Sequence, residues 1–325
     1  WLLRAEAAAI PWIKDFPTKP ILFSTSPPLV SHWLAWRLAK HFSLPWVADF
    51  RDPLVANFGR RSSLGRLMDA PIEKQVVRRA SAILMNTEAA AEELRSRYPT
   101  HAAKIDALPN GYDPEDGFGP LPRPHRPYRL WFHGGSIYRN RYPERLFDSL
   151  WRLTESGKLA SDWRIRLVGA LEDQSLLQRP SFIALASKQL IDINTNVLPK
   201  ADALRAAAEA DGSMVFDHYH SGGPNLAIPA KSFDCIRAER PILAFTSPGA
   251  PLDRLLSLCG VASVRIYEED PPTVIDEKIL AFAQLPPEPT KPSEAFRNLH
   301  SAPEQTRKLA SLLNRLASKH GMLRS

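Results

Sequence analysis

Short runs of apolar and β-branched residues alternate along the chain with longer amphipathic stretches. In the first third of the sequence, residues 21–23, 46–50 and 82–86 have the length and composition of buried strands. Apolar residues at helical spacing predict helices over residues 1–13, 31–41, 64–79 and 88–98. This alternation is typical of a parallel sheet with helices on both faces, so the expected fold class is α/β.

A proline-rich stretch, residues 114–127, interrupts the alternation. Proline fixes its φ angle and has no N–H to donate, so such a stretch suits a linker between domains. Strands are then predicted at residues 128–132, 163–168, 190–193, 212–217, 241–245 and 263–267. We therefore expect one domain over residues 1–120 and a second over 121–300. A final helix within 301–325 carries leucines at helical spacing and should pack back towards the first domain; they are Leu309, Leu312, Leu313 and Leu316.

Composition narrows the class of protein. With 325 residues, 44% of them hydrophobic, the chain can bury the cores of two ordinary α/β domains. A formal net charge of +7 favours anionic partners, which include nucleotides, phospholipid headgroups and nucleic acid. Cys235 and Cys259 lie in apolar helical patterns, which argues against a disulfide framework or a zinc site and for a reducing compartment. No apolar run approaches the roughly 18 to 20 residues that span a bilayer.

Polar segments follow several of the predicted strands, and five of them occur in a distinctive order. They are Ser24-Thr25-Ser26-Pro27-Pro28, Ala48-Asp49-Phe50-Arg51-Asp52, Asn86-Thr87-Glu88, Leu108-Pro109-Asn110-Gly111-Tyr112-Asp113 and Ile228-Pro229-Ala230-Lys231-Ser232-Phe233-Asp234. In this order and spacing they resemble glycosyltransferase family 4, the retaining enzymes of the GT-B fold. The resemblance implies two Rossmann-like domains that face each other across a cleft. The family's first strand, with its Gly-rich loop, has no counterpart, so we expect the first domain to be incomplete at its front.

The resemblance also implies an activity. It is transfer of a sugar from a nucleoside-diphosphate sugar to a glycan or lipid-linked acceptor, with retention and without a metal or another cofactor. Two alternatives stay open: a non-catalytic nucleotide-sugar or glycan-binding module, and a nucleotide-sugar epimerase. We expect a cytoplasmic protein that attaches peripherally to anionic membrane through its charge and its apolar, basic opening, residues 1–14.

A carboxylate in the second domain is the expected ribose ligand. Residues 229–241 resemble the family's Pro-x-Lys-x-x-Glu-Tyr helix, and Asp234 stands where the family usually has Glu. A carboxylate can accept hydrogen bonds from both ribose hydroxyls. The acid that many relatives carry eight positions earlier is replaced by Leu226. The loop before the helix offers further substrate contacts through Gly222, Gly223 and Asn225. The alternative is an Asp on the exposed face of an ordinary helix.

A small-residue turn and a basic cluster follow the first strand of the second domain. Gly134, Gly135 and Ser136 let the backbone approach a ligand, and arginine pairs with diphosphate oxygens in a fork. In related enzymes a basic residue near this place neutralises the departing nucleoside diphosphate. The first choice for that role is Arg141 and the second is Arg139, and Lys231 is a further candidate for the phosphates. The alternative is a tight turn before a solvated basic helix.

The first domain offers candidates at the end of its second strand. Asp49 or Asp52 would orient an acceptor hydroxyl, and Arg51 would hold an acceptor phosphate, although Asp52 can equally be a helix N-cap. For Asn86-Thr87-Glu88 the capping explanation is stronger than an acceptor contact.

Two other patterns carry less weight. Asp217-His218-Tyr219-His220 lacks a third metal ligand at characteristic spacing, so no metal site is expected. Trp33 and Trp36 sit at helical spacing, which favours a core or membrane-proximal surface over nucleic-acid stacking. No nucleic-acid partner is therefore expected.

Overall fold

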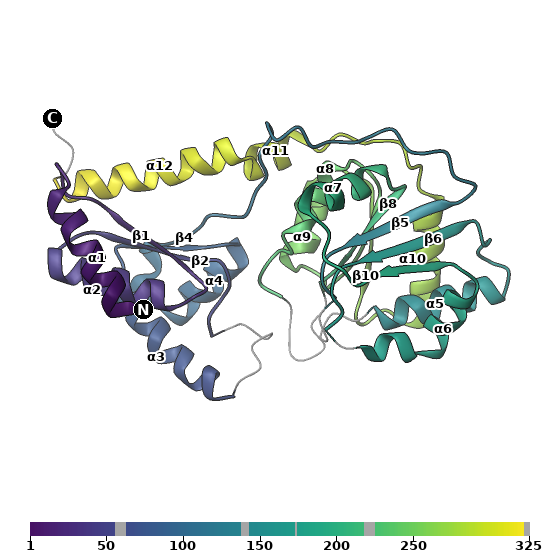
Figure 1. Ribbon diagram of the computed structural model, residues 1–325, viewed down its shortest axis with the longest axis horizontal. Coiled ribbons are helices and arrows are strands. Elements are labelled where there is room, and N and C mark those ends of the chain that lie inside the picture. Colours follow the sequence, from purple (N-terminus) through teal and green to yellow (C-terminus); the bar gives the residue numbers. More distant parts are fainter. Residues whose placement is uncertain (56–62, 138–142, 173, 218–224, 322–325) are drawn as a thin grey trace. The chain divides into compact units, whose positions relative to one another are not determined.

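The computed structural model describes residues 1–55, 63–137, 143–172, 174–217 and 225–321. The chain forms two compact units, Trp1–Gly111 with Ala302–Ser325, and Tyr112–Ser301. Each unit is built on its own parallel sheet with helices around it (Figure 1). The expected α/β class with two Rossmann-like domains is confirmed. The first division between the units falls at Gly111, ahead of the proline-rich stretch and not at residue 120.

The first unit contains a four-stranded parallel sheet in the order β1-β2-β3-β4. Its strands are β1 (Leu22–Ser26), β2 (Trp46–Phe50), β3 (Ala82–Met85) and β4 (Ile105–Ala107). Its helices are α1 (Leu2–Asp15), α2 (Val30–Phe42), α3 (Ser63–Arg79), α4 (Glu88–Arg97), the 3-10 helix η1 (Pro99–Lys104) and α12 (Ala302–Lys319). The carboxyl ends of all four strands lie at the same edge of the sheet, because every neighbouring pair is parallel.

The last helix of the chain belongs to the first unit. Leu316 of α12 is buried with Val47 and Leu84 of the sheet, and further leucines of the same helix pack against this cluster; they are Leu309, Leu312 and Leu313. Burying such a row of leucines removes apolar area from water, which stabilises the fold by about 25 cal/mol for each Å² buried. The leucines recur at the roughly 3.6-residue period of a helix, so one face of α12 covers a sheet formed by residues 22–107.

The second unit contains a six-stranded parallel sheet in the order β10-β9-β8-β5-β6-β7. Its strands are β5 (Arg129–Gly134), β6 (Trp163–Val168), β7 (Ile191–Asn194), β8 (Gly212–Phe216), β9 (Ile242–Thr246) and β10 (Ser263–Tyr267). Its helices are α5 (Glu144–Glu155), α6 (Pro180–Ser187), α7 (Lys200–Glu209), α8 (Lys231–Arg237), α9 (Pro251–Leu258), α10 (Pro272–Gln284) and α11 (Glu294–His300), with the 3-10 helix η2 (Gln174–Gln178).

Alternate residues of these strands face two different cores. On one face, Trp131 of β5 stacks on Trp163 of β6, with ring centroids 5.4 Å apart, and Phe282 of α10 packs against the pair. On the other face, Val215 of β8 and Ile242 of β9 pack with residues of α8 and α9. The period of two along each strand therefore places helices on both sides of the sheet, as a doubly wound fold requires.

The proline-rich stretch is fastened to the second unit at its front. Asp116 accepts hydrogen bonds from the buried guanidinium of Arg237 in α8, one of them at 3.0 Å, and the carbonyl of Phe118 accepts another from Arg237. The ion pair lowers the pKa of Asp116 to about 2. These contacts give a physical reason for including the stretch in the second unit.

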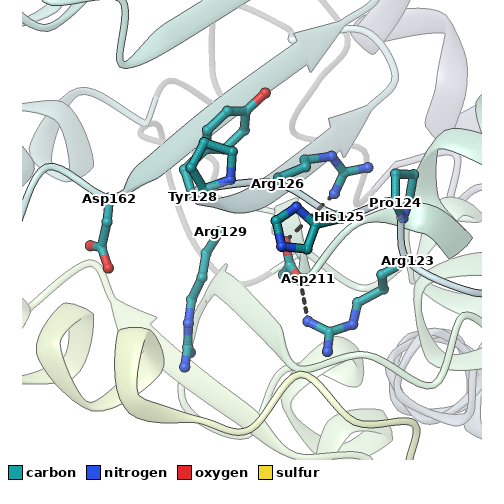
Figure 2. A pocket seen from close by; sticks show the side chains of 9 residues that line it. Arg123, Pro124, His125, Arg126, Tyr128, Arg129, Asp162 and Asp211 are labelled. Carbon is teal, nitrogen blue, oxygen red and sulfur yellow. Dashed lines mark hydrogen bonds and ion pairs between the residues drawn. The ribbon is translucent and has the colours of Figure 1, made fainter.

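The end of the stretch is fastened at the amino-terminal ends of the strands (Figure 2). Arg123 pairs with Asp211, whose other carboxylate oxygen accepts a hydrogen bond from the Leu130 amide at 2.7 Å. Arg126 donates to the carbonyl of Glu209. The segment borders a cavity of about 440 Å³, which is lined by Arg123, Pro124, His125, Arg126, Pro127, Tyr128, Arg129, Asp162 and Asp211. The arginines of this segment thus hold it against the amino-terminal ends of the strands.

Candidate functional site

The sheet of the second unit has a topological switch point between β5 and β8. From β5 the strand order runs outward to β6 and β7 on one side, and to β8, β9 and β10 on the other. In open α/β sheets, ligands bind beyond the carboxyl ends of the strands at such a point, because the loops there diverge to opposite faces. The residues that follow β5 and β8 are therefore the first to consider.

The backbone of the turn after β5 lies close to Val168 and Gly169 at the end of β6. Gly135 has a φ angle of +133°, and its N–H donates to the carbonyl of Val168 at 2.7 Å. A Cβ atom on Gly169 would lie 2.5 Å from the Gly135 carbonyl carbon, so both glycines are needed for this close approach. Gly134 and Ser136, which flank Gly135, are partly exposed beside it. The three predicted substrate-binding residues of this turn lie together.

Lys231 reaches this turn from α8. It is the first residue of the helix, and its Nζ atom lies 3.2 Å from Nε2 of His133. A Cβ atom on Gly135 would lie 2.6 Å from the same Nζ atom. The structure thus brings Lys231 to the glycine turn, although 98 positions separate it from His133, the residue just before the turn. An ammonium group over exposed backbone is suited to an anion such as a diphosphate.

Asp234 lies in the first turn of α8, close after Lys231. Its carboxyl group is half-buried, and this burial raises its pKa, while the positive charges of Lys200 and Arg237 act in the opposite direction. Lys200 is the first residue of α7, and Asp116 lies at the front of the proline-rich stretch, so the side chain of Asp234 has charges of both signs near it. Asp234 is only partly exposed on its helix, and its role as ribose ligand stays a prediction.

Asn225 is held at the end of β8. Its side-chain amide donates to Oδ1 of Asp217 at 2.6 Å, and its own Oδ1 accepts from the amide of Ala227. Asp217 is buried directly after β8, and the hydroxyl of Thr246 donates to its other oxygen at 3.4 Å. Asp217 therefore has a clear positioning role for the segment that carries Asn225, which the sequence pattern did not reveal.

Several predicted residues lie outside the part of the chain that the structure describes. They are Arg139 and Arg141 after the glycine turn, Gly222 and Gly223 before Asn225, and the two histidines His218 and His220 of the dismissed metal pattern. Their roles stay predictions.

The first unit places its candidates at the end of β2. Thr25 of β1 donates to the carboxylate of Asp49 at 2.7 Å, and burial raises the pKa of Asp49. Arg51 and Asp52 follow and are exposed. Residues 53–55, which follow Asp52, are not helical, so Asp52 is not a helix N-cap and that alternative is wrong. At the end of β3, Thr87 accepts a hydrogen bond from the Ala90 amide, which confirms the predicted capping role.

A buried histidine lies beneath these residues. Trp46 donates to the Ser24 hydroxyl at 2.7 Å, and Ser24 lies 2.8 Å from Nδ1 of His32. The Ser24 hydroxyl has two lone pairs and one proton, so it accepts from Trp46 and shares a second hydrogen bond with Nδ1 that can run in either direction. The other nitrogen of the ring is Nε2. That atom has no hydrogen-bond partner among the described residues. Burial lowers the pKa of His32 to about 4.

This histidine predicts a pH-dependent stability. The pKa of His32 is about 6.5 in an unfolded chain and about 4 in the folded one. Its contribution is therefore fully present above pH 6.5 and is lost as the pH falls towards 4. We expect the free energy of unfolding of the first unit to fall by about 2 kcal/mol between pH 7.5 and pH 5, measured by denaturant titration. In His32→Asn, which keeps an acceptor for Ser24, this part of the slope should vanish. An equal loss in both proteins would contradict the assignment.

Large apolar residues and basic residues are exposed in helix α1 and directly beside it. Trp1, Leu3 and Trp12 are 73%, 73% and 75% exposed, and Phe16 follows at 53%. None of the residues in α1 is buried. Arg4, Lys14 and Lys19 are exposed in the same segment. Among the described helices, none is long and apolar enough to cross a membrane.

The first unit matches a known protein family. Residues 3–111 match the family model of a glycosyl transferase 4-like domain. This segment contains β1 to β4 and the candidates Asp49, Arg51 and Asp52. A search of curated proteins finds no match.

Solved structures share the fold over nearly the whole chain. Anabaena HepE, crystallised with UDP, is similar with a TM-score of 0.63 and 12% identity, over 95% of this chain and 82% of that one. The UDP-forming α,α-trehalose-phosphate synthase of Burkholderia xenovorans has a TM-score of 0.62 at 12% identity, over 97% and 78%. The catalytic domain of Arabidopsis thaliana starch synthase IV, bound to ADP and acarbose, has a TM-score of 0.59 at 12% identity, over 96% and 76%.

These comparisons bear out the resemblance to GT-B glycosyltransferases. Residues 3–111 thus match a glycosyl transferase 4-like domain, and the chain shares its two-domain fold with these solved structures.

Proposed function

We propose that the protein transfers a sugar from a nucleoside-diphosphate sugar to a glycan or lipid-linked acceptor, with retention of the anomeric configuration. The observation that carries this proposal is the convergence of Lys231 on the Gly135 turn at the switch point of the second sheet. The charge and the open backbone suit a diphosphate. UDP and ADP in two of the similar structures support a nucleotide donor.

The residues of the second unit divide the recognition of the donor. Lys231 and the backbone of residues 134–136 would hold the diphosphate, and Asp234 would accept the ribose hydroxyls. Arg141 or Arg139 would neutralise the leaving diphosphate. The hydrogen bond from Asn225 to Asp217 would hold the backbone around Asn225 in place for contact with the sugar. We propose catalysis by positioning and by cationic side chains, with no metal and no cofactor besides the donor.

The residues of the first unit would serve the acceptor. Asp49 is half-buried at the end of β2, where a carboxylate with a raised pKa can accept a proton from an acceptor hydroxyl or orient it. The exposed side chains of Arg51 and Asp52 lie next to it along the chain, and Arg51 would bind a phosphate of a lipid-linked acceptor.

A thermal-shift screen tests the nucleotide specificity. UDP, GDP, ADP and their sugars are added to the protein, and a ligand of the folded state raises the melting temperature by mass action. The expected result is a shift with one base, given by both the free diphosphate and its sugar. A protein that responds to none of them would contradict a nucleotide-dependent function.

We also propose that α1 attaches the protein to anionic membrane. Exposed tryptophans favour the interface between headgroups and acyl chains, and each nearby Lys or Arg adds about 1 kcal/mol on an anionic surface. Salt screens the second contribution.

Vesicle pelleting distinguishes these two contributions. At low salt the protein should bind phosphatidylserine-containing vesicles about 100-fold more tightly than neutral ones, because about three basic residues contribute about 1 kcal/mol each. Trp12→Ala should weaken the binding to both kinds of vesicle, and Ile183→Ala, which removes an exposed apolar residue of α6 in the second unit, serves as the control. Equal pelleting with anionic and neutral vesicles would exclude the proposed attachment.

A further inference from the structure

His133 is buried in the strand that leads to the candidate diphosphate site. It lies in β5 with 1% of its surface exposed, and its ring packs against Phe216 with centroids 4.5 Å apart. Its Nδ1 atom lies 2.9 Å from the carbonyl oxygen of Met214 in β8. A carbonyl oxygen only accepts hydrogen bonds, so Nδ1 carries the ring proton. This bond fixes both the tautomer and the orientation of the ring.

The fixed tautomer directs a lone pair towards Lys231. With the proton on Nδ1, the neutral ring has its acceptor at Nε2, and Lys231 Nζ lies 3.2 Å from that atom. An ammonium group only donates, so the donor and acceptor roles of the pair are unambiguous. A protonated ring would instead direct an N–H at the ammonium group. The contact therefore requires a neutral imidazole.

The contact also determines where the ammonium group is held. Nζ of Lys231 lies so close to Gly135 that a Cβ atom at position 135 would be only 2.6 Å from it. Only glycine therefore leaves room for the ammonium group at this place. The side chain of lysine has four rotatable bonds and loses considerable entropy when it is fixed. Held by a buried and immobile ring, the ammonium group is organised in advance over the turn after β5.

We propose that His133 is a positioning residue that holds the Lys231 ammonium group at the Gly135 turn and thereby increases the affinity for a diphosphate. This inference rests on the proposed use of that turn as the donor site. His133 has no contact with the reacting atoms in this scheme, and it acts through Lys231 alone.

Two substitutions separate the halves of the histidine ring. In His133→Asn the side-chain amide reaches the place of Nδ1 and can keep the bond to Met214, but the acceptor for Lys231 is lost. In His133→Gln the amide oxygen reaches the place of Nε2 and can keep the bond from Lys231. We expect a dissociation constant about tenfold higher in the Asn variant, for whichever of UDP, GDP and ADP binds best, and within about threefold of wild type in the Gln variant. Lys231→Met removes the ammonium group itself and should bind at least as weakly as the Asn variant, and adding His133→Asn to Lys231→Met should weaken binding no further.

A spectroscopic measurement reads the contact without any nucleotide. In protein labelled with ¹⁵N-histidine, His133 should have a protonated Nδ1 and an unprotonated Nε2 near pH 7.5, and Lys231→Met should shift its Nε2 resonance. A protonated Nε2, or a resonance that Lys231→Met leaves unchanged, would overturn the contact. Equal nucleotide affinities in the Asn and Gln variants would overturn the positioning role. If the wild-type protein binds none of the three nucleotides, the proposed function fails, and the effect on affinity fails with it, while the resonances still decide the contact.

Discussion

Replacing Gly135 by alanine is expected to weaken nucleoside-diphosphate binding by about 100-fold. The new Cβ atom would lie 2.6 Å from Lys231 Nζ and 3.1 Å from its Cε, so the lysine must leave the turn. Loss of one charge-assisted contact costs about 1.5–3 kcal/mol, and a displaced turn loses backbone N–H donors in addition. Isothermal titration calorimetry with the best-binding nucleotide measures the change.

The control for this substitution is Gly249→Ala. Gly249 has a φ angle of +70°, and a Cβ atom there would meet nothing within 4 Å. It therefore carries the cost of a positive φ angle, about 1 kcal/mol, without a clash near the candidate site. Gly249→Ala should lose stability and keep its nucleotide affinity. If Gly135→Ala bound nucleotide as tightly as Gly249→Ala does, the turn would not be part of the site.

Replacing Asp234 by alanine is expected to weaken the binding of free nucleoside diphosphate and of the sugar donor alike, by about 10- to 100-fold. A ribose holds two hydroxyls against one carboxylate both before and during the reaction, so affinity and not turnover alone should change. Burial raises the pKa of Asp234, which means that the folded state disfavours its charge. The free energy of unfolding should therefore change by less than about 1 kcal/mol.

Asp202→Ala is the matched control for Asp234→Ala. Asp202 also lies in the first turn of a helix of the second unit, and its side chain is exposed. The control removes the same charge from α7, the helix next to α8, at an exposed position with no proposed contact to the ribose. An Asp234 variant with the nucleotide affinity of the Asp202 variant would remove the ribose role from this residue.

The hydrophobic period and the positions of proline predict much of the fold, because both depend on residues close together in the sequence. Strand positions such as 46–50 and 263–267 agree with β2 and β10 at both ends, since both are rich in β-branched and aromatic residues, which favour strands. The three-residue strand β4 (Ile105–Ala107) was not predicted, because it is too short to show a period. The first division between the units was placed late. Proline content indicates a linker, whereas the contacts of Asp116 and Arg123 with distant residues decide which unit it joins.

The candidate site depends on contacts that no local pattern contains. The small residues at 134–136 predict a close approach, but the partner that approaches, Lys231, comes from α8. The sequence places Lys231 only near phosphates in general. His133 and Asp217 had no predicted role, since a buried histidine in a strand and an Asp after one are common without function. Their roles follow from the carbonyl of Met214 and the amide of Asn225, which only the folded chain brings into reach.

The most direct test of the account is release of nucleoside diphosphate from a panel of UDP-, GDP- and ADP-sugars, measured with a mixed glycan and lipid-linked acceptor preparation. The account predicts release from donors of one base, dependent on acceptor, and at least about tenfold slower in Lys231→Met, because a cation at the diphosphate stabilises the departing group. If the wild-type protein bound a nucleotide but released nucleoside diphosphate from none of the donors, the account would be contradicted. The protein would then be a binding module and not an enzyme.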